Sequence, residues 1–145
     1  MPMNKTFEFL EHTADIYVAA YGLTLEESFQ NAALAMVESM TEIKTIMSKI
    51  KDIIEVKAED KVSLLYSWLE SILIKFEVDE KLYSRFEIEK IIKTNQGYIL
   101  KATAYGEIFN PEKHPSKVGI KAVTYHQMEI IEQNDFFIVK FILDI

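Results

Sequence analysis

Two aspartates far apart in the chain have the chemistry to form a metal site together. Asp15 lies in a turn between two apolar segments, and Asp144 follows an apolar, strand-like run just before the final residue, Ile145. A strand that continues to the last residues indicates that this end is built into the fold. If Asp15 lies beside it, the two side chains and the terminal carboxylate would favour a hard divalent cation, Ca²⁺ or Mg²⁺. The plainer alternatives are an Asx turn at Asp15 and a solvated, inert Asp144.

Five further residues could contribute chemistry. His12, His114 and His126 could bind zinc or act as a base, although no two of them have the i, i+4 spacing of helical zinc ligands. Lys121 lies in a strand-like segment, where its ammonium would compensate nearby carboxylates or contact phosphate. Glu107 lies at the end of another strand-like segment, where it could have a functional charge or simply end the strand.

The segments that would position these residues include two helices. Thr24 and Glu27 form a capping box before a helix with one apolar face, and Asp60 can cap a second helix. In the second helix Trp68 recurs with other apolar residues at helical spacing, so we predict that it belongs to the core.

Strand patterns occupy most of the remaining chain. Strands are predicted over residues 7–11, 16–21 and 51–57, a hairpin over 83–107 around Asn95-Gln96-Gly97, and a second hairpin over 119–143 around Gln133-Asn134-Asp135. Two prolines mark residues 110–117 as an exposed functional loop. The pattern predicts a single α+β domain over residues 1–145, with a mainly antiparallel or mixed sheet and two principal helices covering one face.

Composition argues against several classes of protein. The 145 residues carry a net charge of −7, which disfavours strong independent binding to nucleic acid. Cysteine is absent, which excludes disulfides and thiolate sites. The sequence shows neither a signal peptide nor a membrane span, so we expect an intracellular protein.

Several motifs in the order of the chain resemble the archease family. They are His12-Thr13-Ala14-Asp15, Gly22 to Phe29, Gly106-Glu107, Pro111 to His114, Ile120 to His126, and Asp144-Ile145. The resemblance spans almost the entire chain. One departure is Asn110, where many members of the family would have aspartate.

The resemblance implies a non-catalytic, cytoplasmic protein that activates an RtcB-type RNA ligase in tRNA splicing. Such a protein promotes guanylylation of the ligase and multiple turnover, can broaden its nucleotide use, and contacts nucleotide and tRNA only through the ligase. By the same resemblance, Asp15 and Asp144 would bind a divalent cation with a main-chain or terminal oxygen of Ile145, Ca²⁺ being favoured and Mg²⁺ the alternative. His12, Glu107, His114, Lys121 and His126 would form the surrounding partner surface.

Three other functions remain open from the residues alone. A metal-dependent hydrolase could use the cation at Asp15 and Asp144 with His12 or His126 as base. An RNA-binding or chaperone module could use strand aromatics such as Tyr98. An interaction domain could hold a metal with a structural role only.

Overall fold

Seven β-strands, two α-helices and one short 3₁₀ helix form the part of the chain that the computed structural model describes, residues 5–11 and 15–145. In chain order they are β1 (Phe7–Leu10), β2 (Ile16–Gly22), α1 (Leu25–Met40), η1 (Ile43–Thr45), β3 (Ile50–Ala58), α2 (Lys61–Asp79), β4 (Lys81–Thr94), β5 (Gly97–Ile108), β6 (Ala122–Glu132) and β7 (Phe137–Asp144). Both predicted helices and both predicted hairpins are therefore confirmed.

The two helices begin at the capping residues that the sequence predicts. Thr24 accepts a hydrogen bond from the Glu27 N–H at 3.0 Å, which starts α1. The Asp60 side chain accepts one from the Ser63 N–H at 2.8 Å. The Asp60 N–H in turn donates to the Ser63 hydroxyl, which completes a capping box for α2. These short-range bonds satisfy amide groups that have no partner within the first helical turn.

The strands form two antiparallel sheets. One has the order β1-β2-β7-β6 and the other β3-β5-β4. In the first sheet β2, from the start of the chain, pairs along its length with β7, from the end. This pairing brings the two predicted acidic positions to the same sheet.

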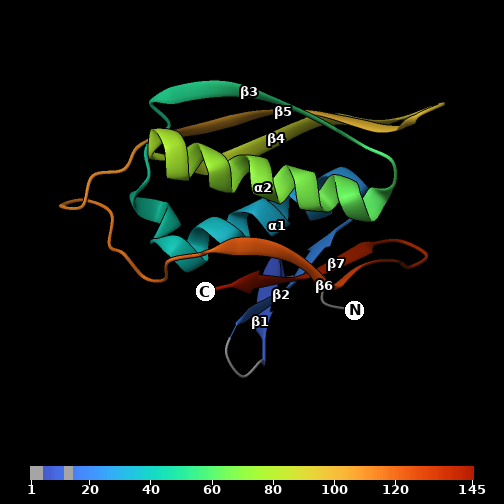
Figure 1. Ribbon diagram of the computed structural model, residues 1–145, viewed down its shortest axis with the longest axis horizontal. Helices are drawn as coiled ribbons and strands as arrows, with labels where there is room; N and C mark the ends of the chain where they lie inside the picture. The colour runs from blue at the N-terminus through green and yellow to red at the C-terminus, as the bar shows by residue number, and fades with distance from the viewer. Residues whose placement is uncertain (1–4, 12–14) are drawn as a thin grey trace.

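The helices lie between the two sheets, as Figure 1 shows. Both α1 and α2 contact strands of each sheet, and the described core includes residues from all three layers. The α+β class, the antiparallel pairing and two principal helices are as predicted; the strands form two sheets rather than one, and the helices cover one face of each. Each helix buries residues around much of its circumference, and such a helix must be covered on more than one side.

Trp68 shows how the layers are joined. Its side chain is fully buried, as predicted, and its indole Nε1–H donates to the Phe29 carbonyl of α1 at 2.9 Å. Its ring also meets the Phe86 ring of β4 edge-on, with centroids 5.7 Å apart. One residue of α2 thus links the other helix and a sheet.

Among residues 5–11 and 15–145, no helix is long and apolar enough to cross a membrane.

Candidate functional site: an acidic sheet end and a buried loop anchor

The antiparallel register brings Asp15 and Asp144 together. Ile16, the first residue of β2, pairs with Leu143 of β7. Asp15 precedes Ile16, and Asp144 follows Leu143, so both aspartates lie one position further toward the same end of the strand pair. Both residues are half-buried. We call this place the acidic end.

Lys121 reaches the acidic end from a third segment. Its backbone N–H donates to the Asp144 carbonyl oxygen at 2.7 Å, and the next residue, Ala122, pairs with Asp144 in the β6–β7 register. The Lys121 side chain is exposed. The second hairpin begins at Ala122 rather than at Gly119, because residues 119–121 belong to the loop that leads into β6.

A hollow of about 330 Å³ adjoins Asp15, with Phe9, Tyr17, Glu38 and Lys117 among the residues that line it. The Lys117 ammonium forms ion pairs with Glu38 and with Glu42, the latter at 3.0 Å, and donates to the Glu38 carbonyl at 3.1 Å. The pKa of Lys117 is raised because its ammonium donates to Glu38. This lysine neutralises charge at the C-terminal end of α1, where a cation also stabilises the unpaired carbonyls.

The donor set at the acidic end suits a hard cation. Carboxylate and carbonyl oxygens are the ligands that Ca²⁺ and Mg²⁺ take, and cysteine is absent from the chain. Within the described ranges 5–11 and 15–145, no group of three or more His, Cys, Asp or Glu side chains could hold a metal ion. Asp15 and Asp144 would therefore supply part of a coordination shell, and the rest would come from main-chain oxygen, water or another molecule.

Glu107 and His114 form a separate, buried cluster. Glu107 is 6% exposed and His114 is 0% exposed. The His114 Nε2 lies 2.9 Å from the Glu107 carboxylate, which also accepts from the Met47 N–H at 2.9 Å and pairs with Lys113 at 2.7 Å. We call this cluster the loop anchor, because it ties the loop after β5 back to the end of that strand.

The hydrogen bonds of His114 define the tautomer of its neutral ring. Its Nδ1 accepts from the Asn110 N–H at 2.9 Å, so the proton resides on Nε2, which donates to Glu107. Burial alone would raise the pKa of Glu107. The Lys113 ammonium, the Met47 N–H and His114 outweigh that effect, and the pKa is lowered to about 2.

This arrangement corrects one expectation. Glu107 and His114 were predicted to belong to the partner surface, but both side chains are largely buried and His114 contacts Glu107. The loop itself is present and largely exposed, as predicted. The two residues hold the loop in place.

His126 lies in an irregular part of β6. Thr124 pairs with Ile142 and Glu129 with Lys140, so four residues of β6 stand opposite one residue of β7. Within this bulge Gln127 adopts a left-handed conformation, with φ of 56°, and His126 is exposed. Such bulges re-aim side chains, here turning His126 to solvent.

The same bulge carries one ring of an aromatic pair, the exposed Tyr125, whose partner Tyr66 is half-buried. The Tyr125 ring stacks on the Tyr66 ring of α2, with centroids 4.2 Å apart and planes 9° apart. Tyr66 in turn donates to Glu70 at 2.8 Å. The stack fixes the bulge against α2.

Of the predicted site residues, His12 lies outside the described residues. The structure brings Asp15, Asp144 and Lys121 together, with Ile145 following directly, and assigns Glu107 and His114 to the loop anchor. Sequence reasoning missed Lys117. Its one signal was its position in a loop with turn chemistry. Its partner on α1, Glu38, is 79 residues earlier in the chain.

A family model and individual relatives all indicate the same protein family. A model of the Archease protein family (MTH1598/TM1083) matches residues 7–145. A protein archease from Sulfolobus acidocaldarius is 45% identical over 139 residues, which cover 96% of this chain and 98% of that protein. A protein archease from Methanosarcina mazei is 44% identical over 126 residues, covering 87% and 86% respectively.

Two solved structures share the fold. The solution structure of protein 1598 from Methanobacterium thermoautotrophicum is similar with a TM-score of 0.84 and 39% identity, covering 97% of this chain and 99% of that one. The crystal structure of an archease from Thermotoga maritima, described as a possible chaperone, has a TM-score of 0.60 and covers 95% and 96%. At 20% identity the second likeness concerns the fold alone.

Proposed function

The chain belongs to the archease family, and we propose that it is a non-catalytic protein that activates an RtcB-type RNA ligase in tRNA splicing. In this proposal it promotes guanylylation of the ligase and multiple turnover, can broaden the ligase's nucleotide use, and acts in the cytoplasm. It contacts nucleotide and tRNA through the ligase. The observation that supports a ligase-contacting surface is that Asp15 and Asp144 lie together at one end of the paired strands β2 and β7.

The acidic end would hold a divalent cation, Ca²⁺ in preference to Mg²⁺. Asp15 and Asp144 would provide carboxylate oxygens, and Ile145 a main-chain oxygen. Ca²⁺ takes six to eight oxygens in flexible geometry, whereas Mg²⁺ demands a regular octahedron. Two side chains leave much of the shell open, which favours the more tolerant ion.

An incomplete shell also supports a role at an interface. A cation held by two carboxylates keeps positions for water or for oxygens of the ligase and its nucleotide. The exposed ammonium of Lys121 lies at the same place in the fold and suits contact with phosphate. We propose that this end docks transiently at the nucleotide-containing cleft of the ligase, where it orients phosphates or delivers the cation.

The test is RNA ligation by a cognate RtcB-type ligase at limiting concentration, with and without this protein. We expect added protein to convert a single round of ligation into many. Asp15→Ala and Asp144→Ala should abolish this stimulation while leaving the circular dichroism spectrum unchanged. Full stimulation by both folded variants would refute the proposal.

Asp135→Asn serves as the matched control. Asp135 lies in the turn between β6 and β7, and Figure 1 shows this turn at the opposite end of β7 from the C-terminus. The variant also removes one negative charge, so it separates a local effect of the acidic end from an effect of net charge. It should stimulate the ligase as the natural sequence does.

The same preparation distinguishes the other functions that the sequence left open. Release of product from phosphoesters by the isolated protein, lost in Asp15→Ala, would favour a hydrolase. Strong, salt-sensitive binding of RNA by the protein alone would favour an RNA-binding module. A cation that raises the melting temperature without any effect on ligation would favour a structural metal.

A further inference from the structure

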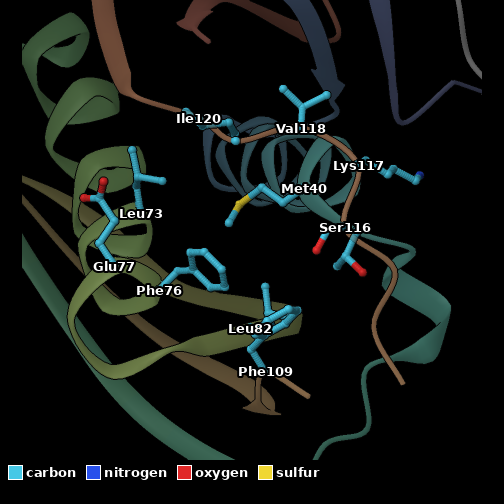
Figure 2. Close-up of a pocket in the computed structure, with 12 residues that line it drawn as sticks. Met40, Leu73, Phe76, Glu77, Leu82, Phe109, Ser116, Lys117, Val118 and Ile120 are labelled. Carbon is cyan, nitrogen blue, oxygen red and sulfur yellow. The ribbon is translucent and has the colours of Figure 1, made fainter. Parts of the chain in front are cut away.

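A pocket of about 360 Å³ lies between the two helices and the segment 116–120 (Figure 2). One lining residue, Phe109, also stacks on His114 of the loop anchor. Five separate parts of the chain line the pocket: the end of α1, the last turns of α2, the start of β4, Phe109, and segment 116–120. The pocket is therefore a concavity formed where these five parts of the chain meet. Its volume lies in the range of small-molecule sites.

Apolar side chains form most of the wall of this pocket, and Ser116 contributes a hydroxyl group. Met40, Leu73 and Phe76 extend toward a common space in Figure 2, with Leu82 and Phe109 below them. The ammonium of Lys117 and the carboxylate of Glu77 both point away from that space. The Lys117 ammonium is occupied by its ion pairs with Glu38 of α1 and with Glu42, just after that helix. A charged ligand would therefore lose its hydration without gaining a partner.

Thr41 adds a buried polar group to this largely apolar wall. The residue lines the pocket and is 1% exposed, and its Oγ1 is buried without a hydrogen-bond partner in the described part of the chain. Its backbone N–H is satisfied by the Val37 carbonyl at 3.0 Å, whereas the hydroxyl has no partner among the described residues. Buried hydroxyl groups are nearly always hydrogen-bonded. The oxygen itself is buried, so it would reach a bound molecule only after rotation about the Cα–Cβ bond to another staggered position.

We propose that this pocket binds a neutral, largely apolar small molecule that carries a single hydrogen-bonding group. The apolar body fills the space around Met40 and Phe76, and the polar group pairs with the Thr41 hydroxyl. This site is distinct from the acidic end, and the proposal does not depend on the proposed ligase function.

A molecule bound in the pocket would change the position of residues that contact the acidic end. Segment 116–120 forms one wall, and the next residue, Lys121, donates its N–H to the Asp144 carbonyl. On the other side of the segment, Lys117 and Val118 also line the hollow beside Asp15. A ligand that moves this wall therefore moves residues that contact both places.

The experiment is an NMR titration of the ¹⁵N-labelled full chain with three probes of similar size: benzyl alcohol, toluene and benzoate. We expect saturable shifts at the amides of residues 40–41, 73, 76 and 116–120. Benzyl alcohol should bind about two- to tenfold more tightly than toluene, the effect of one net hydrogen bond. Benzoate should not bind. Absence of saturable shifts at these amides, or equal affinity for benzyl alcohol and toluene, would overturn the proposal.

Two variants assign the preference to Thr41. Thr41→Val keeps the shape and removes the hydroxyl, so it should bind toluene normally and lose the preference for benzyl alcohol. Thr41→Ser keeps the hydroxyl and should retain that preference, which leaves the assignment testable even if the valine variant folds poorly. A preference that survives in Thr41→Val, or disappears in Thr41→Ser, would contradict the role of the hydroxyl.

Discussion

Replacing Glu107 by Gln tests whether the loop anchor stabilises the fold through charge. The substitution keeps the size of the side chain and an acceptor oxygen for the Met47 N–H and His114, and it removes the negative charge paired with Lys113. Lys49 also approaches this carboxylate, at 3.7 Å. A loss of stability in this variant therefore measures the electrostatic part of the anchor.

The size of the loss follows from the pKa of Glu107. A carboxyl group whose pKa is about 2 in the folded protein, rather than its ordinary 4.5, contributes about 3 kcal/mol to the free energy of unfolding when ionised. The Lys113 side chain is 32% exposed and that of Lys49 is 62% exposed, so solvent screening reduces the expected value to about 2 kcal/mol.

The pH dependence has a defined sign. Because folding lowers the pKa of Glu107, its stabilisation is fully present above pH 4.5 and is lost as the pH falls toward 2. Urea unfolding should give a difference between the natural sequence and Glu107→Gln of about 2 kcal/mol near neutral pH, decreasing to about 1 kcal/mol or less near pH 3.

Glu112→Gln provides the control, since Glu112 is an exposed carboxylate in the same loop. Its effect should stay within about 0.5 kcal/mol at both pH values. A difference for Glu107→Gln that is equally small, or that grows as the pH falls, would refute the account of the loop anchor.

Three further substitutions probe packing and surface charge. Gly106→Ala should destabilise the protein by about 3 kcal/mol or more, because an added Cβ would lie 1.9 Å from the Leu82 carbonyl oxygen and force β4 from β5. Gly119→Ala, whose Cβ would meet nothing within 4 Å, should be neutral or stabilise by up to about 1 kcal/mol in the same urea assay; the reverse order would contradict the strand packing. Lys117→Met should cost about 1 kcal/mol at low salt and less at about 1 M NaCl, and a loss that is independent of salt would argue against its ion pairs.

Local signals predicted the elements well. The caps at Thr24 and Asp60 and the turn before Gly97 each act over a few residues, and each lies where the sequence indicated. The register of β2 and β7, by contrast, joins residues from opposite ends of the chain and is a finding of the structure. That register puts Asp15 opposite Asp144.

The bulge in β6 had no comparable signal. A left-handed residue is usually Gly or Asn, but the chain has Gln127 there. The tertiary contact between Tyr125 and Tyr66 holds this conformation in place. The exposure of His126 therefore depends on packing against α2 rather than on its neighbours in the chain.

By itself, the sequence determined the helices, the hairpins and the two aspartates worth testing, because caps, turns and apolar periodicity are short-range interactions. Only the tertiary structure decided that the helices lie between two sheets, that Glu107 and His114 are buried, and that Thr41 lines an apolar pocket. Each of these outcomes depends on residues that are distant in the chain: Met47 is 60 residues from Glu107, and Met40 and Phe109 meet the same pocket from opposite halves of the sequence. Such contacts form when the layers pack, and no local pattern encodes them.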